Sequence, residues 1–366
     1  MTETELKALC GAITPPDEAA RAAAHAHWAS LAKPLGGLGA LETMLEAAAA
    51  LTGSAALDFS KRAVLVLCAD NGVVAQGVSQ TDSGVTRAVA QNLAARRTSV
   101  CQMARTAHCQ VVPVDLGMAG PKVPGVLDCR IADGTQDFTC GPAMSRAQAV
   151  EAIGKGVALV RTQKAKGTRL LATGEMGIGN TTTSSAVLAA LTGADVEAVT
   201  GRGGGLTDEG FLRKKEVLRQ SLALHRPDKN DVIGVLAGVG GLDLAAMTGA
   251  FLGCAHERVP AAVDGFISIA AALCAVRLCP AVRDYLFLSH DSYEVGYRIA
   301  AEELGLTPCL HLGMRLGEGS GCPLLFRVLE GACGVMRGMA TFDEASIEDG
   351  YLDEIRAMDA FTVEAT

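Results

Sequence analysis

The segment His311–Pro323 holds a single carboxylate, Glu318, between two glycines and directly before an apolar run typical of a helix. Glycine adopts backbone dihedrals that are closed to other residues and lets a chain approach a ligand closely, so Glu318 can project from an open turn toward a small molecule. A carboxylate in that position suits a general base. A polar residue that caps the helix would have the same surroundings, so this segment alone leaves both interpretations open.

A glycine-rich loop, Gly174–Thr183, follows an apolar run at Thr168–Thr173 and precedes a predicted helix over Ser184–Leu191. A strand, a glycine loop and a helix N-terminus in that order bind anions, because free N–H groups and the helix dipole converge there. The loop therefore suits a phosphate. It lacks the lysine of nucleoside-triphosphate loops and the third spaced glycine of dinucleotide fingerprints, so it matches neither. Its three threonines would also serve simply to cap and start the helix.

A second glycine cluster, Gly201–Gly205, precedes a predicted helix that Thr207 caps. Acids in the first turn of that helix and bases later suit its dipole without any ligand, whereas so many glycines have no evident packing purpose. Lys214 or Lys215 would reach a phosphate bound by these glycines. A solvated helix face is the commoner place for such a pair of lysines.

Apolar runs separated by helical patterns predict an α/β fold with a doubly wound, mostly parallel sheet of about six strands. The runs lie at Arg62–Ala69, Cys109–Asp115, Thr168–Thr173, Pro260–Val263, Tyr285–Leu288 and Pro308–His311. Ligands bind beyond the carboxyl ends of such strands. That edge is expected to collect the polar residues Asp70, Asn71, Glu175, Asp264, Ser292 and Glu318. His290, also at a strand end, is interpreted as a hydrogen-bonded structural residue rather than a catalyst.

The chain of 366 residues exceeds the roughly 250–300 that a single core usually holds, so a large domain and a smaller one are expected. We predict a helical small domain over 1–60, joined by the segment 340–366, and a Rossmann-like catalytic domain over 61–339. Within the first, Pro16–Leu51 predicts two helices joined by a glycine turn. The segment 121–142 lacks periodicity and is expected to form a surface excursion or a short antiparallel ribbon.

The net charge of -8, the pI near 5.4 and the lack of any Lys/Arg block argue against nucleic acid as a partner. The N-terminal segment is polar and acidic, and no uncharged apolar stretch is long enough to span a membrane, so a cytoplasmic protein is expected. The 12 cysteines include no Cys-x-x-Cys pair and mostly occupy apolar runs, which favours buried, reduced thiols and no metal site.

Five motifs follow one another along the chain. They are Gly174-Glu-Met-Gly-Ile-Gly-Asn-Thr-Thr182, Gly201-Arg-Gly-Gly-Gly205, Asp264-Gly-Phe266, Ser289-His290 and Arg315-Leu-Gly-Glu-Gly-Ser-Gly321. In sequence and order they resemble the motifs of the nicotinate-nucleotide:dimethylbenzimidazole phosphoribosyltransferases, which make the lower nucleotide of cobamides. The resemblance covers nearly the whole chain, from Gly36-Gly-Leu-Gly39 to past Pro323.

The resemblance implies that the substrate is nicotinate mononucleotide, whose ribose phosphate passes to a ring nitrogen of an aromatic lower-ligand base with inversion at the anomeric carbon. It implies a homodimer and no cofactor. Glu318 matches the family's general base. The positions that match substrate-binding residues are Ser79, Glu175, Gly177, Gly179, Asn180, Thr181, Gly203, Gly204, Gly205, Lys214, Asp264, Ser292 and Leu316. A one-step inverting transfer needs no covalent nucleophile, in keeping with the lack of a Gly-x-Ser-x-Gly motif.

Two stretches depart from the family pattern, Gln80–Val89 and the run 94–98, where relatives carry small residues. They belong to the region that lines the base pocket in relatives, so the accepted base is open among dimethylbenzimidazole, another benzimidazole, a purine and a phenolic compound. Two other functions are considered. A nucleotide-dependent oxidoreductase is disfavoured by the missing dinucleotide fingerprint, and a catalytically silent partner of an active paralogue is disfavoured by the intact Glu318.

Overall fold

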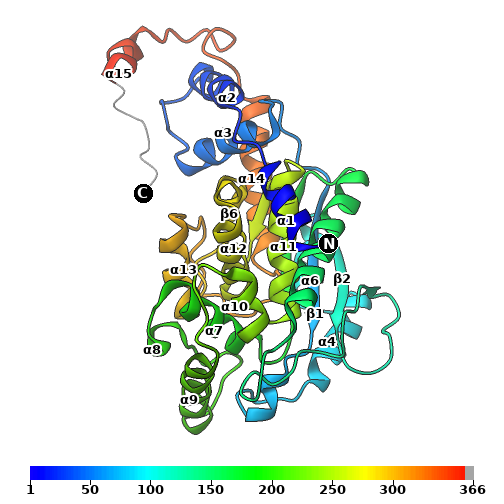
Figure 1. Cartoon of the computed structure of the whole chain (residues 1–366). Helices are drawn as coiled ribbons and strands as arrows, with labels where there is room; N and C mark the ends of the chain where they lie inside the picture. The colour runs from blue at the N-terminus through cyan, green and yellow to red at the C-terminus, as the bar shows by residue number, and fades with distance from the viewer. Residues whose placement is uncertain (359–366) are drawn as a thin grey trace.

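One six-stranded parallel sheet forms the centre of the computed structural model, which describes residues 1–358 (Figure 1). The strands are β1 (Arg62–Ala69), β2 (Gln110–Gly117), β3 (Leu127–Asp128), β4 (Leu170–Met176), β5 (Ala261–Val263) and β6 (Leu286–Leu288). Every residue of β1 is buried, so both faces of the middle of the sheet are covered, as its continuous apolar run predicts. The predicted α/β class and the mostly parallel sheet are confirmed.

The strand order, β3-β2-β1-β4-β5-β6, reverses between β1 and β4. These two strands pair with Leu67 beside Glu175 and Cys68 beside Met176, so their carboxyl ends lie side by side. In open α/β sheets a crevice forms where the order reverses, because the loops that follow the two strands run in opposite directions. The fold therefore places a crevice next to the predicted anion loop.

Two groups of helices cover the sheet. Helices α11 and α12 pack against β1, β4 and β5, with α6 outside α11, while α4, α5 and α14 pack against the strands as a second group. The helices are α1 (Glu3–Gly11), α2 (Glu18–Ser30), α3 (Ala40–Thr52), α4 (Gly84–Ala94), α5 (Ser99–Thr106), α6 (Arg146–Ala165), α7 (Asn180–Thr192), α8 (Val196–Val199), α9 (Asp208–His225), α10 (Val232–Val239), α11 (Leu242–His256), α12 (Phe266–Leu278), α13 (Gly296–Leu304), α14 (Cys322–Gly338) and α15 (Asp353–Met358). Short 3-10 turns are η1 (Gly72–Gln76), η2 (Pro280–Tyr285) and η3 (Gly350–Leu352).

Helix boundaries follow the capping signals in the sequence. The side chains of Ser145 and Thr207 accept backbone N–H groups at the starts of α6 and α9, as predicted. Helix α7 begins earlier than predicted, at Asn180 instead of Ser184, because Gly179 takes a left-handed conformation (φ 91°) that turns the chain at the helix entrance. Part of the predicted anion loop is therefore the first turn of a helix.

The sixth strand is not where the sequence predicted it. Pro308–His311 forms no strand, since this run is partly exposed and the Leu310 carbonyl accepts the N–H of Asp291 from a loop. The sixth strand is instead β3, within 121–142, and it pairs parallel to β2. The alternative of an antiparallel ribbon there is wrong, and the segment is not purely a surface excursion, because Phe138 is fully buried in a small second core.

Helices α2 and α3 pack against each other, and α3 also packs on α14. Figure 1 shows α2 and α3 protruding from the body at the end opposite α9. An isolated bridge joins Leu31 to Thr341, so the segment after α14 returns to this helical part. Helix α1, in contrast, contacts α6 and α11 of the sheet region. The division into 1–60 with 340–366 and 61–339 stays a prediction, and residues 359–366 of it lie outside the described part.

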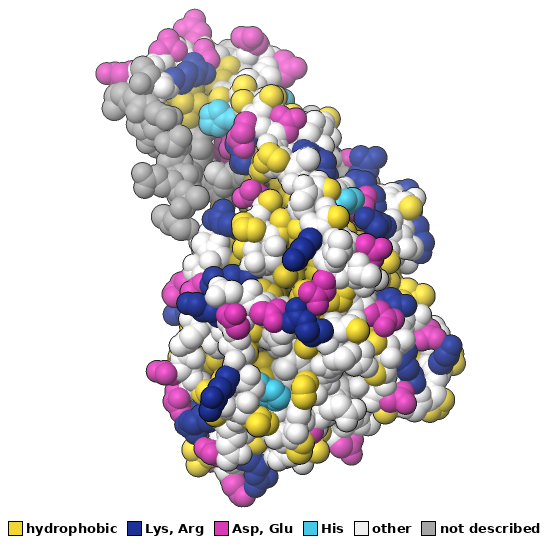
Figure 2. All heavy atoms as spheres, in the orientation of Figure 1, with side chains coloured by type: hydrophobic (Ala, Val, Ile, Leu, Met, Phe, Trp, Pro, Cys, Tyr) yellow, Lys and Arg dark blue, Asp and Glu magenta, His cyan; other side chains and the backbone are white. Residues whose placement is uncertain are grey.

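Charged side chains of both signs are interspersed over the face in Figure 2, without a large area of one sign. All twelve cysteines are free, and every one except Cys140 is at least partly buried, as expected for thiols in apolar runs. Within residues 1–358, no helix is both long and apolar enough to cross a membrane. In the same part of the chain, no group of three His, Cys, Asp or Glu side chains is placed to hold a metal ion.

Candidate active site

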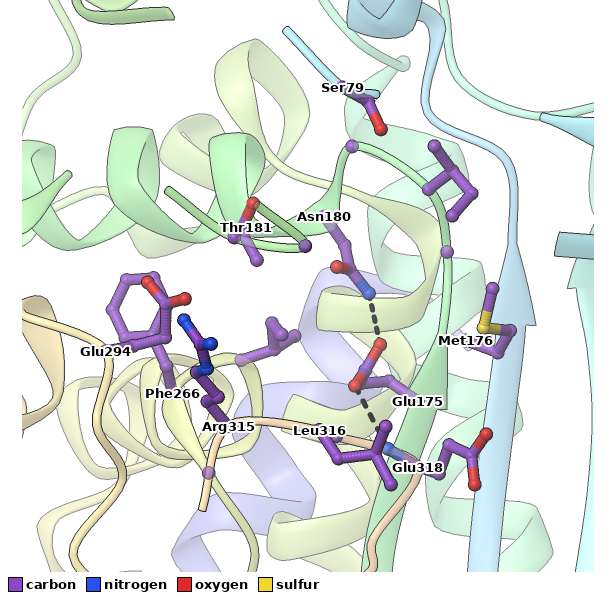
Figure 3. A pocket seen from close by; sticks show the side chains of 18 of the residues that line it. Ser79, Glu175, Met176, Asn180, Thr181, Phe266, Glu294, Arg315, Leu316 and Glu318 are labelled. Atoms are coloured by element: carbon purple, nitrogen blue, oxygen red, sulfur yellow. Dashed lines mark hydrogen bonds between the residues drawn. The ribbon is translucent and has the colours of Figure 1, made fainter. Parts of the chain in front are cut away.

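A pocket of about 350 Å³ lies where β4, β5 and β6 end (Figure 3). All the catalytic and substrate-binding residues that the family resemblance implies line it, except Lys214. They are Ser79, Glu175, Gly177, Gly179, Asn180, Thr181, Gly203, Gly204, Gly205, Asp264, Ser292, Leu316 and Glu318. The chain thus brings together one edge of the sheet, both glycine clusters and the turn that carries the predicted base.

Asp70 and Asn71 follow β1 as predicted but do not line this pocket. The Asp70 carboxylate accepts the N–H of Ala119 at 2.8 Å, and the Asn71 amide donates to the Ile178 carbonyl at 3.3 Å. Both side chains are buried. They hold neighbouring loops together at the edge of the sheet where they were expected, but they do not form part of the pocket wall.

One end of the pocket is suited to an anion. Gly203 and Gly205 have left-handed backbones (φ 55° and 111°), and a Cβ atom at Gly203 would lie 2.8 Å from the Thr181 hydroxyl, so the glycine loop touches the start of α7. Arg202 and Arg315 also line this pocket, and the Arg202 guanidinium is paired with Asp208. A helix N-terminus, a glycine-rich backbone and an arginine side chain are groups that bind phosphate or carboxylate.

Lys214 lies one layer behind the pocket wall. Its side chain is fully buried, and its ammonium donates to the Thr181 hydroxyl at 2.8 Å and to the Gly201 carbonyl at 3.1 Å. Burial lowers the pKa of Lys214 to about 8, and the nearby Glu294 carboxylate opposes this change. A buried ammonium with neutral hydrogen-bond acceptors would be stabilised by an anion bound next to it. The predicted phosphate contact of Lys214 stays a prediction.

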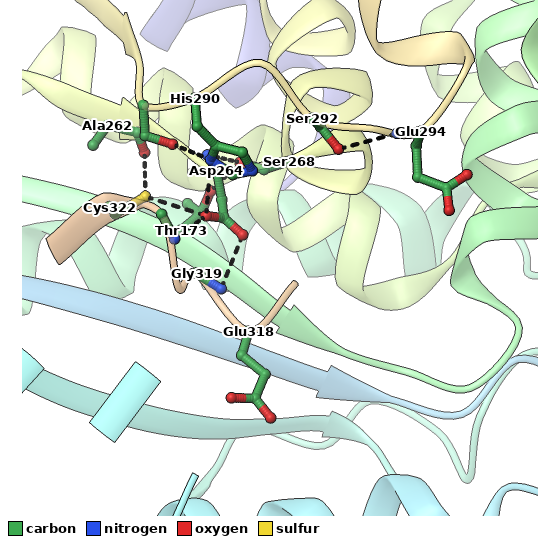
Figure 4. Close-up of polar contacts among 12 residues, drawn as sticks. Thr173, Ala262, Asp264, Ser268, His290, Ser292, Glu294, Glu318, Gly319 and Cys322 are labelled. Atoms are coloured by element: carbon green, nitrogen blue, oxygen red, sulfur yellow. Dashed lines mark hydrogen bonds and ion pairs between the residues drawn. The ribbon is translucent and has the colours of Figure 1, made fainter. Parts of the chain in front are cut away.

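Three successive left-handed residues present the predicted base: Gly317 (φ 89°), Glu318 (φ 62°) and Gly319 (φ 82°). This backbone costs a non-glycine residue roughly 1–2 kcal/mol, so neighbouring groups must hold it in place. The Glu318 N–H donates to Glu175 Oε1 at 3.3 Å (Figure 3), and the Gly319 N–H donates to Asp264 Oδ2 at 3.1 Å (Figure 4). Two buried carboxyl groups thus fix a strained turn at the site.

The Glu318 side chain and the Arg315 side chain lie at opposite ends of the same short segment (Figure 3). Glu318 Oε2 accepts the N–H of Val100, the second residue of α5, at 3.3 Å. Burial raises the pKa of the Glu318 carboxyl above its ordinary value, and backbone N–H groups at the start of α5 act in the opposite direction. A carboxylate whose conjugate acid has a raised pKa is a stronger base, which suits proton transfer.

Burial dominates the titration of the two carboxyl groups that hold this turn. It raises the pKa of Glu175 to about 8 and that of Asp264 to about 7, although hydrogen bonds from Asn180 and from backbone N–H groups oppose the change. His290 lies 3.9 Å from Asp264 and accepts or donates a hydrogen bond with Ser289, and burial lowers the pKa of His290, which favours its neutral ring. His290 also lines the pocket, and its structural role stays a prediction.

These raised pKa values predict that stability falls as the pH rises from 6 to 8. Both carboxyl groups bind protons more tightly in the folded chain than in the unfolded chain, so their neutral forms stabilise the fold below the unfolded pKa and this contribution is lost as the pH passes the folded pKa. The lowered pKa of His290 acts in the opposite direction at pH values up to about its ordinary value of 6.5, and the lowered pKa of Lys214 does so above about 8. Urea unfolding at pH 6, 7 and 8 measures how the free energy of unfolding changes with pH. The decrease should be smaller in Glu175→Gln. A free energy of unfolding that rises from pH 6 to 8 would contradict the raised pKa values.

Gly174 lets β4 pass directly under the catalytic turn. A Cβ atom there would lie 2.3 Å from the Glu318 carbonyl oxygen, so either the strand or the turn must move. We expect Gly174→Ala to lower kcat at least tenfold, because displacements of about 1 Å cost up to about 10²-fold in well-oriented reactions. The matched change Gly334→Ala on α14 meets nothing within 4 Å and should leave kcat unchanged. Equal kcat values for the two variants would show that the turn tolerates the displacement.

Several wall residues were not predicted as site residues. They are Val78, Gln80, Thr81, Val89, Met176, Ile178, Arg202, Leu206, Gly265, Phe266, Ile267, Ser268, His290, Glu294, Arg315 and Gly317. Arg202 and Arg315 stand inside the quoted motifs, and their charge was a usable signal for the anion end. The apolar residues gave no such signal, because an apolar residue in a helix or strand usually belongs to the core.

The fold and this pocket define an α/β enzyme that holds an anionic small molecule near a carboxylate base. A model of a phosphoribosyltransferase family matches residues 13–347. The chain is 45% identical over 337 residues to the nicotinate-nucleotide:dimethylbenzimidazole phosphoribosyltransferase of Roseiflexus sp., covering 92% of this chain and 96% of the relative. The enzyme of the same name from Clostridium perfringens is 41% identical over 335 residues, with 91% and 93% covered.

The crystal structure of CobT from Thermus thermophilus matches with a TM-score of 0.86 at 40% identity, covering 91% of this chain and 100% of that chain. The chain therefore belongs to the nicotinate-nucleotide:dimethylbenzimidazole phosphoribosyltransferase family, as the motifs predicted.

Proposed function

We propose that this chain transfers the ribose 5-phosphate of nicotinate mononucleotide to a ring nitrogen of an aromatic lower-ligand base, with inversion at the anomeric carbon. The products are nicotinate and the α-ribotide of the base; with 5,6-dimethylbenzimidazole this is α-ribazole 5'-phosphate, a component of the cobamide nucleotide loop. The observation that carries the proposal is one pocket with cationic and glycine-rich groups at one end and the Glu318 carboxylate at the other.

The anion end suits the ribose phosphate. Gly203, Gly204 and Gly205 line that end without side chains, and Arg315 supplies positive charge. Arg202 also lines the pocket, with its guanidinium paired to Asp208. The remaining predicted substrate contacts belong to the same proposal, namely Ser79, Glu175, Gly177, Gly179, Asn180, Thr181, Lys214, Asp264, Ser292 and Leu316.

Glu175 and Asp264 line the same pocket beside the turn of Glu318, and positive charge develops on the ribose ring as the bond to the pyridine nitrogen breaks. Both groups have raised pKa values, so a cationic substrate would favour their ionised forms. Ionised carboxylates next to a developing oxocarbenium ion lower the barrier by electrostatic stabilisation.

Proton transfer at the acceptor completes the reaction. The acceptor nitrogen forms a bond to the anomeric carbon while the bond to the pyridine nitrogen breaks, and nicotinate leaves with that electron pair and loses its ring charge. The acceptor then carries an acidic N–H, whose proton passes to the Glu318 carboxylate. Val89 and Met176 provide apolar surface in the same pocket for a flat aromatic base.

Incubation of the purified chain alone with nicotinate mononucleotide and single bases tests the proposal. The panel contains dimethylbenzimidazole, unsubstituted benzimidazole, adenine and phenol, because the sequence leaves the accepted base open. Mass spectrometry of the products should show nicotinate and one new ribotide, and NMR should show the α anomer. Turnover by the chain alone excludes a need for a paralogue partner, whereas no ribotide with any base would overturn the proposal.

We also propose that the enzyme is a homodimer and acts in the cytoplasm, as the family resemblance implies. Sedimentation equilibrium of the purified chain measures the first point. A mass of one chain at micromolar concentration would contradict it.

A further inference from the structure

The Glu318 carboxylate occupies a place that a capping side chain normally fills. Thr98 is the residue before helix α5 and has extended dihedrals (φ -86°, ψ 168°), yet its side chain makes no capping hydrogen bond. A threonine in this position usually accepts the N–H of the second or third helical residue. Here the N–H of Val100, the second residue, is taken by Glu318 Oε2 at 3.3 Å, from 218 residues away in the chain.

The Thr98 hydroxyl makes no hydrogen bond to the backbone of α5. The residue is 8% exposed, and its hydroxyl oxygen is buried without a hydrogen-bond partner of ordinary geometry among the described residues. A buried hydroxyl that makes no hydrogen bond destabilises a protein, so such a group in a well-packed site indicates a partner in another state. The hydroxyl lies close enough to Glu318 to favour the ionised carboxylate.

We propose that Thr98 is a positioning residue for the general base: its hydroxyl donates a hydrogen bond to the Glu318 carboxylate and, with the N–H groups at the start of α5, keeps that carboxylate ionised and aimed at the acceptor. The inference rests on the proposed function. Thr98 lies at the start of α5, and none of the five sequence motifs contains it.

Few charged groups face Glu318. Glu175 from the end of β4 and Asp264 from the end of β5 hold its turn, and both are acidic. Within residues 1–358, Glu318 forms no ion pair with a Lys, Arg or His side chain. Hydrogen-bond donors of α5 are therefore the groups that oppose burial and keep the carboxylate charged. Removal of one donor raises the pKa of an acid, because it stabilised only the charged form.

The direction of the pH effect follows from this. Glu318 accepts a proton only when it is ionised, so kcat falls on the acidic side as the carboxyl becomes protonated. In Thr98→Val this acidic limb should move to higher pH by about one unit, which corresponds to about 1.4 kcal/mol. At a pH well above the limb the variant should approach the kcat of the original chain. The KM for nicotinate mononucleotide should stay unchanged, since Thr98 lies away from the anion end.

The experiment measures kcat and KM from pH 5 to 9 for the original chain, Thr98→Val, Thr98→Ser and Thr106→Val. Thr98→Ser keeps the hydroxyl and should restore the acidic limb. Thr106→Val makes the same change at the other end of α5, where the hydroxyl bonds the Met103 carbonyl, and should leave the profile unchanged. The melting temperatures of all variants distinguish a loss of stability from an effect on the pH dependence of kcat.

Three outcomes decide the inference. A shifted limb in Thr98→Val that Thr98→Ser restores supports it. A lower melting temperature with an unmoved limb would mean that Thr98 only stabilises α5, and would overturn it; if Thr98→Val does not fold, an unmoved limb in Thr98→Ala overturns it equally. An original chain that forms no ribotide at any pH would instead overturn the proposed function, so the two failures are distinguishable.

Discussion

Glu318→Gln is expected to lower kcat by about 10²–10⁴-fold, the usual contribution of a positioned general base. Glutamine has nearly the same shape and can still accept the N–H of Val100, but its amide cannot take the proton of the acceptor base. The anion end of the pocket is untouched, so the Kd for nicotinate mononucleotide should stay within about threefold. Product formation under saturating substrates measures kcat, and calorimetric titration measures the Kd.

The exposed Glu302 on α13 provides a matched control, because Glu302→Gln makes the same change far from the pocket. It should retain full kcat. If Glu318→Gln turned over at a rate similar to that of the control, the carboxylate would have no part in proton transfer. A loss of both substrate binding and turnover would instead show that Glu318 stabilises the turn and does not act as the proton acceptor.

Lys214→Met should raise the KM for nicotinate mononucleotide by about 10- to 100-fold, since a hydrogen bond to a charged group contributes roughly 1.5–3 kcal/mol and each 1.4 kcal/mol is tenfold. Methionine fills the buried volume of the lysine side chain without its charge. The loss should be in substrate binding, because Lys214 contacts Thr181 and Gly201 at the anion end and not the turn of Glu318.

The dephosphorylated substrate, nicotinate riboside, separates a phosphate contact from a structural effect. Its KM should be poor with the original chain and should hardly change in Lys214→Met. The neighbouring Lys215 packs its ammonium over the Phe211 ring at 4.3 Å on the same helix, so Lys215→Met controls for the loss of a lysine. Equal losses with both substrates would show that Lys214 supports the glycine loop and does not meet the phosphate.

Local sequence patterns were sufficient for most of the sheet and missed one strand. The apolar run at Arg62–Ala69 predicts a strand buried on both faces, and every residue of β1 is buried. The run Pro308–His311 has the same local character but no place at the sheet edge, and the two-residue β3 takes the sixth position. A segment forms a strand only if folding places it beside a free edge of the sheet. A short apolar run does not determine that placement.

The site divides in the same way. The sequence by itself determined the two glycine clusters and the isolated carboxylate of Glu318, because left-handed turns and close backbone contacts require glycine at particular positions. It could not show that Asp70 binds the loop after β2 and does not line the pocket, or that Lys214 is fully buried behind it. Those facts depend on how separate loops pack.

Only the tertiary structure decided what surrounds the base. The Glu318 carboxylate accepts the N–H of Val100, which is 218 residues away in the sequence. Carboxyl groups at the ends of β4 and β5 hold the turn that carries Glu318. Hydrophobic periodicity and turn chemistry act over a few residues, so they specify elements. The protonation and direction of a buried carboxylate depend instead on desolvation and on donors that folding brings from distant parts of the chain.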